Sequence, residues 1–271
     1  MTTESDRAAT ELPSKYLKAA PTLDLPEPKR LRNYIGASVI LSATALGSGE
    51  TILWPYIATQ VGLALVWLSI VGITFQFFLN MEISRYTLAT GETAVTGFSR
   101  LWLPWGVIFV LGAILPNTFP GWASSGSTVI TFIFDLNSSA VPLISTLFLV
   151  SIGLAVTLSP VIYKTLEKAE AVMVTVIIAF VIVAIIIATD ADAWGKVVTS
   201  TPSGVAGLGD SIEVLGLASL FGAVVFAGAG GANNLVQSNY LRDKGMGMGI
   251  NIPNIVSPIT GEDVAAPSLG Y

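Results

Sequence analysis

Long apolar runs restrict the fold of this chain more than any other feature. Between Val172 and Ala188 only Thr175 is polar, and several other runs approach or exceed the ~20 residues that a helix needs to cross a bilayer. Charged residues make up 11% of the chain, against roughly 25% in an ordinary soluble domain. The alternating pattern of a membrane β-barrel is missing. The sequence therefore predicts an all-α, polytopic membrane protein.

The chain contains no Cys and no His among its 271 residues. This excludes a zinc site of the thiolate or imidazole kind, a Ser-His-Asp triad and a disulfide scaffold within it. No basic stripe suggests a nucleic-acid partner, and no pair of acids lies near the polar interruptions described below. We therefore expect a protein that is not an enzyme, with no cofactor and with the lipid bilayer as its environment.

Three regions follow from polarity. Residues 1–33 are polar and contain four prolines, which is typical of a loose tail. Residues 34–244 are predicted to form the transmembrane domain, and residues 245–271 a polar cytoplasmic segment. A hydrophilic loop with Asp190, Asp192 and Asp210 is expected before the last span. The predicted spans lie at about 34–59, 63–88, 101–134, 140–158, 167–189 and 212–241, with the third as one long, kinked span.

The distribution of basic residues predicts the orientation of these spans. If the spans alternate from an inside N-terminus, every Lys and Arg except Lys196 lies on the inner side. Basic residues are retained on the cytoplasmic side, so we expect a cytoplasmic N-terminus in an integral protein of the plasma (inner) membrane. Glu82 and Arg85, three residues apart near the inner end of the second span, are expected to be an ion pair or snorkelling groups rather than ligands.

Two spans carry polar, glycine-rich interruptions. Gly47-Ser48-Gly49-Glu50 interrupts the first span and the segment 228–234 interrupts the sixth. An unwound segment at membrane depth persists only where it is buried in protein or lines a cavity. A matched pair of such breaks is the best sequence indicator of the binding site in transporters built from inverted repeats. One glycine patch alone would indicate close helix packing, but the pair, with an acid, favours a site.

The chemistry of the breaks favours a hard cation. A helix that ends at a break presents free carbonyls, and the helix that begins there presents free N–H groups. A carboxylate beside free carbonyls, with amide and hydroxyl oxygens nearby, suits a cation such as Mg²⁺ or Mn²⁺. The predicted metal-binding residues are Gly47, Ser48, Glu50 and Thr51 at the first break and Gly228, Gly231, Asn233 and Asn234 at the second.

Three segments resemble the Nramp family of divalent-metal transporters, which have the LeuT-type inverted-repeat fold. Residues Tyr163 to Glu170 resemble the entry to that family's fifth helix, and residues Gly231 to Ser238 are similar to its sixth-helix motif Met-Pro-His-Asn. Gly47 to Glu50 lies where the family has Asp-Pro-Gly-Asn. The resemblance, over about residues 34–244, implies alternating-access transport of a divalent metal cation (Mg²⁺, Mn²⁺ or Fe²⁺).

The chain also departs from the Nramp pattern. The family's first-helix Asp corresponds to Gly47, and an acid is gained at Glu50. The family's metal-binding Met and its sixth-helix His correspond to Gly231 and Asn233, and no acid stands in the third span, where the family's proton route runs. These departures point to a divergent Nramp-related branch and leave the coupling ion open.

Two other functions remain open from the sequence. Gly47-Ser48-Gly49 also resembles the Gly-Ser-Gly turn of amino-acid permeases of the same fold, in which N–H groups hold a carboxylate. A non-transporting membrane subunit is the other alternative. Nramp-like proteins have ten or more spans in two five-helix repeats. We therefore expect this chain to be a fragment, the first repeat plus one helix, with the remaining half of the transporter as its partner.

Overall fold

The computed structural model describes residues 15–17, 24–27, 52–119, 121–158, 162–228 and 230–252, and in these ranges it contains helices and no strand. The elements are α3 (Trp54–Val61), the 3-10 helix η3 (Gly62–Leu65), α4 (Val66–Thr90), α5 (Ala94–Leu101), α6 (Pro104–Asn117), α7 (Gly121–Ile133), the 3-10 helix η4 (Ser138–Ala140), α8 (Val141–Thr157), α9 (Ile162–Ala188), α10 (Ala191–Ala206), α11 (Leu208–Leu215), α12 (Leu217–Val225), α13 (Ala232–Asp243) and the 3-10 helix η5 (Gly247–Asn251).

Four helical stretches in the described residues are long and apolar enough to cross a membrane. They are Trp54–Thr90, Pro104–Ile133, Ser138–Thr157 and Glu167–Ala188, and α11 with α12 makes a fifth if this bent pair counts as one span. The last three stretches agree with the predicted third to fifth spans, including one long third span. Trp54–Thr90 contains the predicted second span, 63–88, but it also takes in residues 54–59, which were predicted to end the first span. Most of the predicted first span lies outside the described residues.

The apolar side chains of these helices face outward. Phe75 and Phe77 on α4, Phe132 on α7 and Ile186 and Ile187 on α9 are all exposed. A soluble protein would leave such surfaces in water, at about 25 cal/mol for each Å², whereas hydrocarbon solvates them without that cost. The fold is therefore that of a helical membrane protein.

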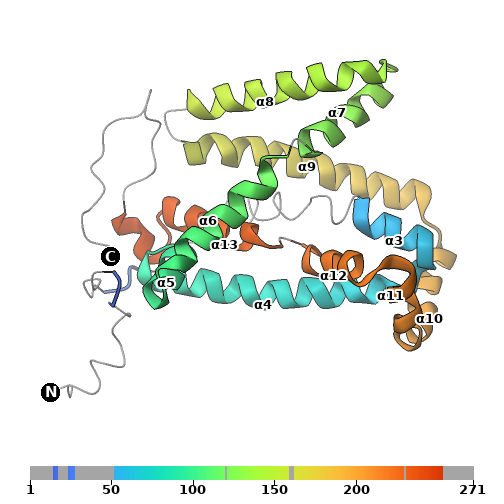
Figure 1. The fold of residues 1–271 in the computed structure, drawn as a ribbon, viewed down its shortest axis with the longest axis horizontal. Coiled ribbons are helices and arrows are strands. Elements are labelled where there is room, and N and C mark those ends of the chain that lie inside the picture. The colour runs from blue at the N-terminus through green and yellow to red at the C-terminus, as the bar shows by residue number, and fades with distance from the viewer. Residues whose placement is uncertain are drawn as a thin grey trace.

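Helix α4 is the centre of one packed group of helices. Figure 1 shows α12 and then α13 following α4 along its length, and both helices contact it. Ile57 of α3, Leu65 of η3 and Leu220 of α12 form a buried apolar cluster near the start of α4. At the other end, the Ala94 N–H of α5 donates to Ser238 Oγ of α13 at 2.9 Å. The helix α4 therefore supports both halves of the predicted sixth span.

Helices α7, α8 and α9 form a second group, drawn at the top of Figure 1. Helix α7 packs on α8 through small polar side chains, and Ser145 Oγ donates to Ser127 Oγ at 2.9 Å. An ion pair joins the two groups, with Lys244 Nζ after α13 at 2.6 Å from Glu167 Oε1 near the start of α9. Elsewhere these helices present apolar side chains outward, as lipid-facing helices do.

The segment after α9, which the sequence predicted to be a hydrophilic loop, is the helix α10. Asp190 caps it, because its Oδ1 accepts a hydrogen bond from the Ala193 N–H at 2.8 Å, and Asp192 pairs with Lys196 one turn on. The prediction was wrong because the acids that indicated a loop are the N-terminal cap and first turn of a helix.

The predicted sixth span also contains a bend that its sequence did not indicate. Helices α11 and α12 meet at 104°, and Gly216 between them has φ of 76°. Glycine adopts this left-handed region without the steric cost that other residues incur. The bend comes in addition to the interruption between α12 and α13.

Candidate functional site

The helix break between α12 and α13 is the centre of the candidate site. Helix α12 ends at Val225, and α13 begins at Ala232. Gly228 and Gly231, both predicted site residues, have φ of 93° and 66°, values that favour glycine over any residue with a Cβ. The structure therefore interrupts the helix where the glycine pattern predicted it. Asn233 and Asn234, however, lie in the first turn of α13 rather than in the unwound segment.

Gln76 of α4 connects the two sides of the break. Its Nε2 donates to the Val225 carbonyl at 2.8 Å, and its Oε1 accepts from Asn234 Nδ2 at 2.6 Å. The Val225 carbonyl is among the last of α12, which have no partner inside the helix. One amide therefore satisfies the end of α12 and orients the start of α13.

Replacing Gln76 by Leu should destabilise the protein by about 1–3 kcal/mol, because it leaves the Val225 carbonyl and Asn234 Nδ2 without this partner in a region shielded from water. Thermal unfolding of the purified protein in detergent would measure the loss. Gln60→Leu is the matched control, because Gln60 is exposed and, among the described residues, its Nε2 bonds the neighbouring Thr59. Equal midpoints for the two variants would contradict the bridging role of Gln76.

A second polar contact follows one turn farther along the same two helices. Gln237 Nε2 of α13 donates to Ser84 Oγ and lies 3.4 Å from the Asn80 carbonyl of α4. Gln76, Asn80 and Ser84 are spaced by four residues, so they occupy one face of α4. We call this contact between α4 and α13 the polar seam, comprising Gln76, Asn80, Ser84, Asn234 and Gln237. In the sequence, the α4 side of this seam is visible as three polar residues, Gln76, Asn80 and Ser84, at helical spacing in an apolar span.

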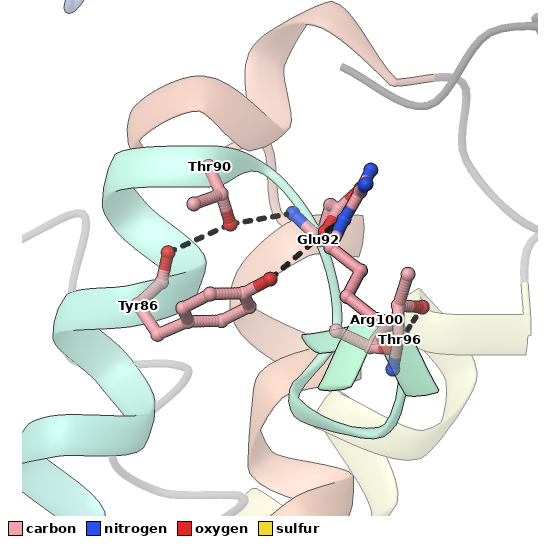
Figure 2. Close-up of polar contacts among 6 residues, drawn as sticks. Tyr86, Thr90, Glu92, Thr96 and Arg100 are labelled. Atoms are coloured by element: carbon pink, nitrogen blue, oxygen red, sulfur yellow. Dashed lines mark hydrogen bonds and ion pairs between the residues drawn. The ribbon is translucent and has the colours of Figure 1, made fainter. Parts of the chain in front are cut away.

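A buried ion pair lies beyond the C-terminal end of α4. Arg100 and Glu92 have side chains that are 2% and 4% exposed, and Arg100 Nε donates to Glu92 Oε2 at 2.8 Å. Figure 2 shows Tyr86 directing its hydroxyl at the same carboxylate, at 2.8 Å. The hydrogen bond to Glu92 raises the pKa of Arg100 above its ordinary value. Glu92 and Arg100 lie between the predicted second and third spans, and no sequence pattern indicated their burial.

The groups around this ion pair hold the Glu92 carboxylate in a fixed position. The Glu92 N–H donates to Thr90 Oγ1 at 3.1 Å, which in turn donates to the Tyr86 carbonyl at 2.8 Å (Figure 2). The carboxylate is therefore held by a guanidinium, a phenol and a main-chain turn. An apolar pocket of about 310 Å³ lies beside it and is lined by Leu79, Ile83, Phe98 and Leu101 among others. We assign the ion pair to the junction of α4 with α5 rather than to the site.

The described residues provide only part of the predicted metal site. Gly228, Gly231 and Asn234 lie around the break, while the Asn233 side chain and residues Gly47, Ser48, Glu50 and Thr51 lie outside the part of the chain that the structure describes. Among the described residues, no three His, Cys, Asp or Glu side chains come together. Ligands from this part would therefore be amide and main-chain oxygens, and the predicted carboxylate would come from Glu50.

Comparisons with protein-family models, with curated proteins and with solved structures found no match for this chain. The resemblance to Nramp transporters therefore stays a prediction from three sequence segments.

Proposed function

We propose that this chain is part of a secondary transporter that moves divalent metal cations, Mg²⁺, Mn²⁺ or Fe²⁺, by alternating access. The ion would bind between the unwound parts of the first and sixth spans. The observation that carries this proposal is the break between α12 and α13, held open by glycines with positive φ and bridged by Gln76. A structural helix in lipid has no need of such a break, because each unpaired backbone group in hydrocarbon is costly.

The polarity of the break suits a cation on the α12 side. The carbonyl end of α12 carries the negative end of its helix dipole, and the amides of Gln76 and Asn234 lie next to it. Glu50, opening the second half of the first span, would add the full negative charge. Hard divalent cations prefer such sets of carboxylate, amide and carbonyl oxygens.

The relative direction of α4 and α13 supports the predicted six-span topology. Gln76 meets Asn234, and Ser84 meets Gln237, so α4 and α13 run in the same direction. Second and sixth spans of a chain that crosses the membrane alternately must be parallel. This agreement favours the six-span arrangement in which the two breaks belong to corresponding positions of two repeats.

A second candidate function rests on the start of α13. This helix begins at Ala232, and its N-cap residue Gly231 provides no side chain to cap the first N–H groups; such an end favours carboxylates and other anions. An amino-acid transporter of the same fold would use those groups for its substrate's carboxylate. The permease-like alternative therefore stays open beside the metal transporter.

Uptake into proteoliposomes tests the proposal. We expect proteoliposomes that hold the full-length protein to take up Mn²⁺, Mg²⁺ or Fe²⁺, and Glu50→Gln to reduce uptake at least about tenfold, because it removes the predicted carboxylate ligand. Glu82→Gln is the matched control, since Glu82 is exposed on α4 and pairs with Arg85. Uptake of a labelled amino-acid mixture, retained in Glu50→Gln, would favour the permease-like alternative. Unchanged metal uptake in Glu50→Gln would refute the proposed ligand.

A further inference from the structure

Three side-chain oxygens in the polar seam have no hydrogen-bond donor in the described part of the chain. They are Asn80 Oδ1, Asn234 Oδ1 and Gln237 Oε1. Asn234 and Gln237 are 2% and 8% exposed, so bulk water does not solvate them. Buried polar atoms of this kind are few in native proteins, and a bound ion or an ordered water is a common reason for them.

The orientation of Asn234 follows from its partners rather than from the choice of amide rotamer. The Val225 carbonyl can only accept, so Gln76 must present Nε2 to it at 2.8 Å. The Oε1 of Gln76 then accepts, and Asn234 must present Nδ2 at 2.6 Å. Exchanging the two ends of either amide would place acceptors against each other. The Oδ1 of Asn234 is therefore fixed as an acceptor that faces away from Gln76.

Gln237 is fixed in the same manner. The hydroxyl of Ser84 donates to the Asn80 carbonyl at 2.7 Å, so its oxygen is left to accept from Gln237 Nε2. The same Nε2 also lies 3.4 Å from the Asn80 carbonyl, which can only accept. The Oε1 of Gln237 is thus a second directed acceptor, three residues from Asn234 on the same face of α13.

Each of these three oxygens is an acceptor without a donor among the described residues. Any ligand there must bring positive charge or hydrogen-bond donors, because an anion or another carbonyl would be repelled. We propose that the polar seam binds a monovalent metal cation such as Na⁺, with Asn234 Oδ1, Gln237 Oε1 and Asn80 Oδ1 as ligands. This site shares Asn234 with the break, but Gln237 and Asn80 lie farther along the seam and none of the residues around Glu50 takes part, so the proposal can be tested apart from the proposed transport function.

The ligands of the polar seam favour a monovalent cation over a divalent one. They are neutral amide oxygens, which suit hard cations, but no carboxylate lies among them to offset the cost of removing a divalent ion from water. That cost grows with the square of the charge. The N-terminal dipole of α13, close to Asn234, opposes a cation further. A monovalent ion bound with millimolar affinity satisfies both constraints.

The test is thermal unfolding of the purified full chain in detergent, in NaCl, KCl or choline chloride at equal ionic strength. We expect Na⁺ or K⁺ to raise the unfolding midpoint over choline by about 3 °C, as for a ligand present at several times its dissociation constant. Gln237→Met keeps the volume of the side chain and removes the acceptor. It also removes the donor to Ser84 Oγ, so the midpoint of this variant in choline is its own reference, and the ion-dependent shift above that reference should be abolished.

Two further variants separate binding from general stability. Ser145→Ala removes the hydrogen bond to Ser127 between α7 and α8, so it should lower every midpoint and keep the ion-dependent difference. Gln237→Glu adds a carboxylate and should shift the preference toward Mg²⁺. Equal wild-type midpoints in the three salts would show that only water occupies the seam and would overturn the proposal. A larger effect of Mg²⁺ than of Na⁺ on the wild type would overturn the monovalent assignment.

Discussion

Replacing Arg100 by Met should lower the free energy of unfolding by about 3–5 kcal/mol, because it leaves the Glu92 carboxylate buried without its guanidinium. The two side chains are 2% and 4% exposed, so water cannot take over the lost contacts. Tyr86 would remain as a donor to Glu92, which places the expected loss within this range rather than above it. Chemical unfolding in detergent would measure the change.

The double variant Glu92→Leu with Arg100→Met separates the loss of a partner from the value of the pair. Replacement of a whole buried pair by apolar side chains is often neutral or stabilising, so the double variant should be more stable than Arg100→Met. Arg85→Met is the control, because Arg85 and Glu82 are 76% and 56% exposed, and such exposed pairs contribute at most about 1 kcal/mol. A double variant as unstable as the single would contradict this account.

Replacing Gly204 by Ala should destabilise the protein by about 3 kcal/mol or more. A Cβ at Gly204 would overlap the main-chain oxygen of Ala64, so α10 would have to move away from η3. Main-chain atoms in a packed contact cannot rotate aside as a long side chain does, and overpacking of this kind costs about 1–3 kcal/mol or more. Thermal unfolding in detergent would detect the change.

The matched control lies in the same helix. A Cβ added at Gly195 would meet no atom within 4 Å apart from its own helix, so Gly195→Ala should stabilise α10 by about 0.5–1 kcal/mol. The same substitution should therefore have opposite signs at two positions of one helix. If both variants lowered the midpoint equally, α10 would not pack on η3 through Gly204.

The sequence predicted the spanning helices well because lipid demands long apolar runs and little else. The predicted fifth span, 167–189, agrees with Glu167–Ala188, and the fourth and third agree as closely. Of the two expectations for Glu82 and Arg85, the structure shows the ion pair, because residues three apart on a helix meet whatever the tertiary fold.

The sequence was least informative where residues far apart in the chain meet. The burial of Glu92 and Arg100 depends on how α5 lies against α4 and α13, which no local pattern encodes. Helix α10 was missed because Asp190 indicates a loop and a helix cap equally well. The glycines at 228 and 231 did predict the break, since positive φ is a local property. Its partner Gln76 is 149 residues away from Val225, and only packing reveals it.

The polar seam has a consequence for how the protein enters the membrane. Helix α13 contains Asn233, Asn234, Gln237, Ser238 and Asn239 among its 12 residues, so it would insert poorly into lipid unless α4 were already present. Its partner on α4 is made 158 residues earlier, which at about 5–20 residues per second means roughly 8–30 s of synthesis. During that interval Gln76, Asn80 and Ser84 are without their contacts on α13. The arrival of α13 therefore completes the insertion of α4 as well as its own.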